Sequence, residues 1–149
     1  MNFILVTVDP ELSNGRPGVA FDLVQWRLSR HLWPLYKRTR NRTAIAAGAR
    51  VAFYVGGSRR LAGNIIATAN AQDLRRQTDV DPPNVLSDPA SIVLSLHEVR
   101  QLKVPIRFRD VLPDLSIAPK NMSKWGVVLH GGSRRLTDAD WAKLFESSL

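Results

Sequence analysis

Segments with the composition of β-strands dominate this chain, and only two segments have the apolar spacing of a sizeable helix. The first expected helix spans residues 19–31, where apolar residues recur every three or four positions and form one face. Pro34 blocks its extension, because the proline ring fixes φ and disfavours helical geometry at Trp33, which is therefore expected at a bend. The second expected helix begins after Thr137, an N-cap residue, with Asp140 in the position of a capping-box acid.

Most of the remaining chain is expected to form strands or loops. Strands are expected at residues 1–8, 50–55, 61–71, 92–108 and 125–130. The second and third of these form a hairpin around Gly56 and Gly57, and Pro105 marks an edge or a break in the fourth. The polar stretch 73–89 is expected to be a long loop. This order predicts one mixed α+β domain over residues 1–149, with a strongly bent sheet or a partial barrel.

The region from Leu23 to Gln72 contains no aspartate or glutamate. It carries eight arginines and Lys37 and so supplies +9, whereas the rest of the chain, with twelve basic and thirteen acidic residues, sums to −1. Arg27 and Arg30 fall outside the apolar face of the first helix. The aromatic residues of this region are Trp26, Trp33, Tyr36, Phe53 and Tyr54. A basic surface interleaved with aromatic rings favours a nucleic acid, whose phosphates attract cations and whose bases stack on rings.

The composition argues against several other classes of function. The chain has no cysteine, which excludes disulfides, zinc thiolate sites and cysteine nucleophiles. No apolar run approaches the ~20 residues needed to span a bilayer, so no membrane partner is expected and a cytoplasmic location is the default. The three histidines lack helical metal-pair spacing, and common catalytic and nucleotide-binding motifs are missing. Because most acids lie away from the basic region, the sequence predicts no enzyme, no metal and no cofactor.

The hexapeptide Gly-Gly-Ser-Arg-Arg-Leu occurs twice, at residues 56–61 and 131–136. Each copy is expected to follow a strand. The favoured interpretation is two tight turns with exposed arginines. The alternative is two anion-binding turns, whose backbone N–H groups and arginines face phosphate.

Several segments of the chain resemble the EVE family of the PUA-like superfamily, which is related to YTH and ASCH domains. Residues 32–42 and 48–57 resemble the family's tryptophan bend, its basic polar stretch and its Gly-Asp-x-Val-x-Phe-Tyr strand. Residues 112–117, 120–126, 131–132 and 136–144, the last with Asp140, also follow the family order. Two departures stand out: Pro34 replaces the usual glycine after the tryptophan, and Ala49 replaces the usual aspartate.

The resemblance implies an α+β PUA-like pseudobarrel of about five to six mostly antiparallel strands flanked by helices, with an open pocket. EVE-like domains are linked to modified bases in DNA or RNA, often 5-methylcytosine or N6-methyladenine, and YTH domains hold a methylated adenine in an aromatic cage. The chain is thus expected to recognise a methylated base flipped into an aromatic pocket, without catalysis. The expected pocket residues are Trp33, Pro34, Leu35, Tyr54, Asn121, Ser123 and Trp125. The expected phosphate contacts are Lys37, Arg38, Arg40, Arg42, Arg59, Arg60, Lys120 and Lys124.

Other roles remain open for these residues and for the chain. Core packing is the alternative role for both Trp33 and Trp125. The alternative function is a general RNA-binding PUA-like module that acts on tRNA or rRNA without dependence on modification. A nucleic-acid-processing enzyme and a sensor of a small molecule such as a free nucleoside are further alternatives. The charge argues for nucleic acid, only the resemblance argues for a modified base, and neither indicates an oligomeric state.

Overall fold

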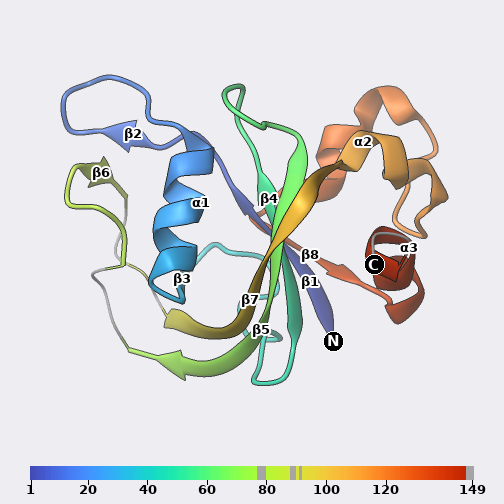
Figure 1. The fold of residues 1–149 in the computed structure, drawn as a ribbon. Helices are drawn as coiled ribbons and strands as arrows, with labels where there is room; N and C mark the ends of the chain where they lie inside the picture. The colour runs from blue at the N-terminus through green and yellow to red at the C-terminus, as the bar shows by residue number, and fades with distance from the viewer. Residues whose placement is uncertain (77–79, 88–89, 91, 147–149) are drawn as a thin grey trace.

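The computed structural model describes residues 1–76, 80–87, 90 and 92–146 of the chain. Its main element is a six-stranded sheet in the order β3-β7-β5-β4-β1-β8. Its strands are β1 (Asn2–Thr7), β3 (Leu32–Leu35), β4 (Arg50–Val55), β5 (Asn64–Arg75), β7 (Ile92–Arg107) and β8 (Ser133–Leu136). β1 runs parallel to β4, the other pairs are antiparallel, and the sheet curls strongly (Figure 1). The expected PUA-like pseudobarrel of the α+β class is confirmed.

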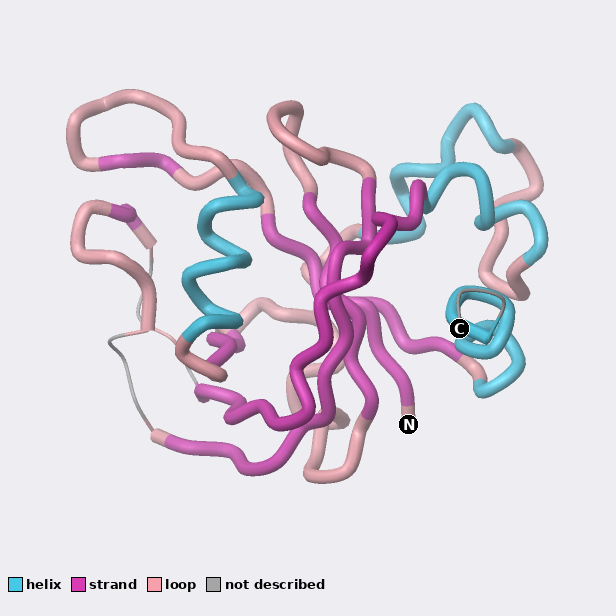
Figure 2. Tube along the Cα trace, viewed as in Figure 1, coloured by secondary structure: helices cyan, strands magenta, loops and turns pink. Residues whose placement is uncertain are grey.

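Helices lie on both sides of this sheet (Figures 1 and 2). On one side lies α1 (Ala20–Ser29). The other side carries α2 (Phe108–Val111), the 3₁₀ helices η1 (Leu112–Asp114) and η2 (Met122–Leu129), and α3 (Asp138–Phe145). A small second sheet, in which β2 (Glu11–Leu12) pairs with β6 (Val85–Leu86), projects on the α1 side of the molecule.

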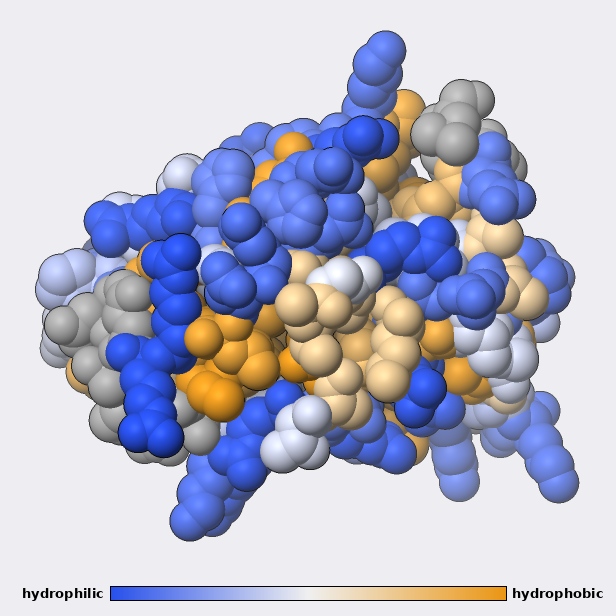
Figure 3. Space-filling model, turned by 90° about the horizontal axis from the view of Figure 1, so that it is seen from below, coloured by the Kyte–Doolittle hydropathy of each residue, from blue (hydrophilic) through white to orange (hydrophobic). Residues whose placement is uncertain are grey.

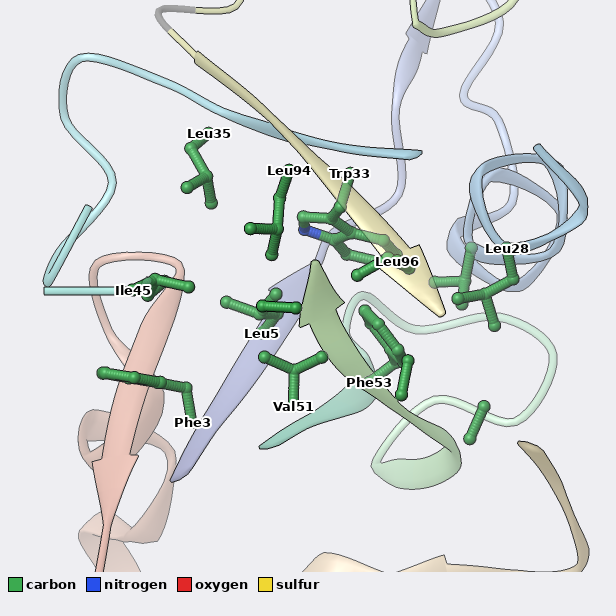
Figure 4. Packing of buried hydrophobic residues seen from close by; sticks show 14 of the residues in the cluster. Phe3, Leu5, Leu28, Trp33, Leu35, Ile45, Val51, Phe53, Leu94 and Leu96 are labelled. Atoms are coloured by element: carbon green, nitrogen blue, oxygen red, sulfur yellow. The ribbon is translucent and has the colours of Figure 1, made fainter. Parts of the chain in front are cut away.

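Two hydrophobic clusters fill the space between the sheet and its helices. The first contains buried side chains of β1, β3, β4, β7 and α1, which point toward one another in Figure 4. In this cluster Trp33 is 2% exposed and packs against Phe53, with ring centroids 4.5 Å apart. Tyr54 belongs to the second cluster, where its ring meets Phe108 edge-on at 5.8 Å. Because side chains alternate along β4, Phe53 and Tyr54 are buried on opposite faces of the sheet.

Several of the expected elements are confirmed. The first helix forms, and β4 and β5 form the expected antiparallel hairpin. At the start of α3, Thr137 Oγ1 accepts a hydrogen bond from the Asp140 backbone N–H at 3.1 Å, as expected of an N-cap. Residues 92–107 form one continuous strand. Pro105 lies where the register of β5 against β7 shifts, so it breaks the pairing rather than the strand.

The bend expected at Trp33 is wrong, because Trp33 lies within the strand β3. This strand is at the edge of the sheet, where a residue without a backbone N–H is tolerated, so Pro34 continues the strand.

The strand expected at residues 125–130 is also wrong, because Met122–Leu129 form the 3₁₀ helix η2. Asn121 caps it, since its side-chain oxygen accepts a hydrogen bond from the Ser123 N–H at 3.0 Å. A short apolar run lacks the periodicity that separates a strand from a buried helix. The expected loop at 73–89 contains the end of β5 and all of β6, and its residues 77–79 and 88–89 lie outside the described part.

Figure 3 shows one face of the molecule. Seen from below, charged and polar residues surround a central apolar area (Figure 3). Within the described part of the chain, the large apolar side chains that are exposed are Met1, Val8, Leu74, Leu86, Val104 and Val127. None of the described helices has the length and apolar character needed to cross a membrane.

Candidate nucleic-acid interface

A pocket of about 580 Å³ opens between α1, the ends of β1 and β3, and the small sheet of β2 and β6. Residues 129–132, where η2 leads into β8, complete its wall. Of the expected pocket residues, Trp33, Pro34 and Leu35 line this pocket. Tyr54, Asn121, Ser123 and Trp125 do not line it.

The expected aromatic cage is not present. Trp33 is almost wholly buried against Phe53, and Trp125 packs half-buried against the second hydrophobic cluster. Tyr54 lies in that same cluster, on the other face of the sheet, and burial raises the pKa of its hydroxyl. The sheet therefore separates Trp33 from the other two rings. Tyr36 is the second aromatic residue that lines the pocket within the described part of the chain.

A buried ion pair forms part of the pocket wall. Arg27 is 5% exposed, and its guanidinium binds Asp81 through two hydrogen bonds, Nε to Oδ1 at 2.7 Å and Nη2 to Oδ2 at 2.8 Å. It also donates to Thr7 Oγ1 at 3.2 Å and lies 4.8 Å from the ring centroid of Trp33. This bidentate geometry is the strong form of an arginine–carboxylate pair. The pair fixes the segment around Asp81 to α1, and it leaves Arg27 without a free charge.

Tyr36 joins the same network. Its hydroxyl donates to Asp81 Oδ2 at 3.0 Å and accepts from Arg27 Nη2 at 3.3 Å. Burial, more than any other cause, raises the pKa of Tyr36, and the neighbouring Asp81 carboxylate raises it further while Arg27 opposes the rise. The hydroxyl therefore stays protonated at neutral pH and remains a hydrogen-bond donor in the pocket wall.

The basic loop, residues 36–42, borders the pocket through Tyr36 and Thr39. Its Lys37, Arg38 and Arg40 side chains are exposed, and Arg42 is half-buried. These four residues are expected phosphate contacts, and the structure groups them in one loop beside the pocket.

The second copy of the hexapeptide anchors the basic loop. The Arg40 N–H donates to the Gly131 carbonyl at 2.8 Å, and Ser133 Oγ donates to the Arg40 carbonyl. A Cβ atom at Gly131 would lie only 3.0 Å from Arg40 Cβ, so glycine permits this close approach. The copy follows η2 rather than a strand, and its last four residues form β8.

The first copy of the hexapeptide is a turn that already holds an anion of the chain itself. The Ser58 N–H donates to Asp9 Oδ2 at 3.0 Å, while the other oxygen of Asp9 accepts from the Ala20 N–H at the start of α1, also at 3.0 Å. Arg59 and Arg60 are exposed, as the tight-turn interpretation expects, and Arg60 lies 4.4 Å from the Phe21 ring centroid. Asp9 thus links this turn to α1 and to the pocket, whose wall includes it.

The fold brings acids to the basic region, contrary to the expectation that they lie away from it. Asp9, Glu11 and Asp81 all line the pocket, and Arg50 pairs with Asp138 at 3.2 Å. The described residues contain no group of three or more His, Asp or Glu side chains that could hold a metal ion. Lys120 and Lys124 are exposed around η2, outside the pocket wall.

The residues that sequence reasoning missed are Thr7, Arg27, Tyr36 and Asp81. Tyr36 lies inside the acid-free region, which is a usable signal. Arg27 and Asp81 are 54 positions apart, and nothing in a single sequence pairs them.

No protein-family model matches the chain, and no curated protein matches it. Among solved structures, the N-terminal domain of Staphylothermus marinus McrB superposes with a TM-score of 0.61 over 97% of this chain and 93% of that one, at 10% sequence identity. At this identity the likeness establishes the fold alone. The chain therefore shares its fold with a McrB N-terminal domain over nearly its whole length.

Proposed function

We propose that this chain is a non-catalytic nucleic-acid-binding module that takes a methylated base, flipped out of its strand, into the pocket beside the basic loop. The observation that carries the proposal is the position of a pocket of about 580 Å³, large enough to hold a base, next to a loop with three exposed cations. A flipped base and its flanking phosphates need both features side by side.

The basic loop supplies the phosphate contacts in this proposal. Lys37, Arg38 and Arg40 point into solvent from a loop whose backbone is fixed by residues 131–133, so their positions are partly organised before binding. Arg42, Arg59, Arg60, Lys120 and Lys124 extend the proposed contact to neighbouring phosphates. Each phosphate contact releases counterions, which makes the affinity fall with salt concentration.

The pocket supplies the base contacts. Tyr36 is the proposed stacking surface, because it is the lining aromatic that is not part of the core, and one stacked base contributes ~1–3 kcal/mol. Apolar side chains such as Leu35 and Val85 line the walls, where one buried methyl group adds ~0.8 kcal/mol. A methyl group alone gives weak selectivity, so the backbone of residues 130–132 is proposed to read the base edge.

The resemblance to the EVE family, which is linked to modified bases, supports this proposal. The fold shared with the McrB N-terminal domain is consistent with it. No catalytic step is proposed, because the pocket carboxylate with the best-defined geometry, Asp81, is already engaged by Arg27 and Tyr36.

Binding to matched oligonucleotides tests the proposal. We expect tighter binding to strands that carry a single 5-methylcytosine or N6-methyladenine than to the unmodified strands, in either DNA or RNA. Tyr36→Ala should reduce this discrimination, whereas Arg38→Ala should weaken binding to both forms and lower the salt dependence. Equal affinity of the wild type for modified and unmodified strands would exclude the proposal, and a preference for RNA without regard to modification would favour the general RNA-binding alternative.

A further inference from the structure

Two exposed apolar side chains stand at the mouth of the pocket. Val8 is 64% exposed and Leu86 is 53% exposed, and both belong to the residues that line the pocket. Exposed apolar side chains that share the rim of a pocket are typical of a binding surface, whereas isolated ones elsewhere on a protein are common. The pocket therefore has an apolar rim as well as a basic one.

Backbone hydrogen bonds hold the segments on this side of the pocket in place. Leu86 lies in β6, opposite Glu11 of β2, and the Ser13 N–H donates to the Asn84 carbonyl at 2.9 Å. On the side of α1, Trp26 Nε1 donates to the Val80 carbonyl at 2.9 Å, next to the Arg27–Asp81 pair. Leu86 thus projects from a supported pair of strands, and Val8 from the loop that joins β1 to β2.

The charges around the apolar rim differ from those around the basic loop. Asp9, Glu11 and Asp81 line this side of the pocket, and Arg27, the one arginine among the described residues of its wall, is paired with Asp81. Arg27 neutralises Asp81, but Glu11 is exposed and a carboxylate repels phosphates, so the rim around Glu11 and Leu86 does not suit the backbone of a nucleic acid. Apolar side chains among carboxylates suit the flat faces of bases instead.

We propose that Val8 and Leu86 form an apolar wedge that enters the base stack of a duplex where the pocket has extracted a base. The inference rests on the proposed function and adds that the substrate is double-stranded. Extracting a base leaves a gap whose neighbours have lost a stacking partner, and an inserted apolar side chain fills it. A single strand has no such gap and does not need the wedge.

The test compares one methylated strand, alone and in a duplex, for the wild type and the Val8→Ala/Leu86→Ala variant. The probe is an oligonucleotide with one 5-methylcytosine or N6-methyladenine, whichever the wild type prefers. We expect the variant to lose roughly tenfold in affinity for the duplex and less than about twofold for the single strand. Val127→Ala is the matched control, because Val127 is 58% exposed but does not line this pocket.

A second readout follows the wedge directly. 2-Aminopurine placed beside the methylated base reports its stacking by fluorescence. An aliphatic wedge keeps this neighbour apart from other bases, which quench it, so the wild type should make it brighten in the complex and the variant should make it brighten less.

An equal loss of affinity on the duplex and the single strand, or no loss on the duplex, would overturn the wedge. If the wild type binds the methylated single strand but not the methylated duplex, the wedge is also overturned, while base recognition stays intact. If the wild type does not distinguish methylated from unmodified strands, the proposed function fails. The wedge is then still decided by the comparison of duplex with single strand.

Discussion

The two copies of Gly-Gly-Ser-Arg-Arg-Leu adopt different structures in this protein. In both, the second glycine has a left-handed φ, +76° at Gly57 and +81° at Gly132. The first glycines already differ, since Gly131 has a φ of +89° and Gly56 has no positive φ, and after the second glycine the copies diverge further. Residues 58–61 stay in a turn, with Leu61 half-buried at a φ of +56°, whereas residues 133–136 form the strand β8 and bury Leu136.

The difference lies in what each copy meets. The first copy lies against the Asp9 carboxylate, which accepts a hydrogen bond from the Ser58 N–H. The second meets the open edge of β1 and pairs with it from Leu5–Ser133 to Asn2–Leu136. The glycine pair thus specifies the start of a turn, and the backbone or carboxylate beside it decides how the next four residues fold.

The largest expected difference between the copies concerns their leucines. Leu136→Ala should lower the free energy of unfolding by about 2–4 kcal/mol, because Leu136 is 3% exposed within the second cluster. Leu61→Ala should cost roughly 1 kcal/mol or less, because Leu61 is only partly buried. Urea denaturation of the two variants measures both values. Equal losses would mean that the two copies are packed alike.

Gly57 and Gly132 have nearly equal φ angles but different surroundings. A Cβ at Gly57 would lie 2.4 Å from the Asp9 carboxyl group, whereas at Gly132 the nearest atom is a Thr39 methyl at 3.8 Å. Gly57→Ala should therefore cost about 2 kcal/mol and Gly132→Ala about 1 kcal/mol, the latter from backbone strain alone. In thermal unfolding, Asp9→Ala should relieve part of the Gly57→Ala cost. Strict additivity of these two changes would contradict the contact.

The arginines separate the copies by function. Under the proposed function, replacing Arg59 and Arg60 with alanine should reduce the slope of log affinity against log salt concentration by up to about 2. Replacing Arg134 and Arg135 should change the slope less, because these residues belong to β8 and are not expected phosphate contacts. Titrations of one oligonucleotide at several salt concentrations provide the slopes. A larger change for the second pair would reverse the assignment.

The smallest expected effect is the pH dependence next to the second copy. A hydrogen bond from Asn2 Nδ2 at 2.8 Å, more than any other cause, holds the pKa of Asp138 below its ordinary value of 3.8, and Arg50 adds to this. A depressed pKa stabilises the fold above pH 3.8, and this contribution is lost as the pH falls through the lower folded-state value. Asp138→Asn should therefore show a slightly weaker acid dependence of stability than the wild type. An unchanged acid dependence would show that the Asn2 contact is unimportant in solution.

The sequence by itself determined the features that depend on neighbouring residues. The apolar spacing of α1, the glycine-linked hairpin of β4 and β5 and the Thr137 cap of α3 each involve residues within one element or one turn. Such contacts are short in sequence, so their residue types carry the information. The acid-free region also indicated the basic loop, because charge is visible without a fold.

Only the tertiary structure decided which residues share the pocket. Trp33 and Tyr54 lie on opposite faces of one sheet, so they cannot form one cage, and the alternation along β4 becomes meaningful only when both faces are covered. Arg27 looked like a surface cation of α1, but Asp81, far along the chain, draws it into the pocket wall. A buried charge needs a partner, and which partner comes within reach depends on how the whole chain is folded.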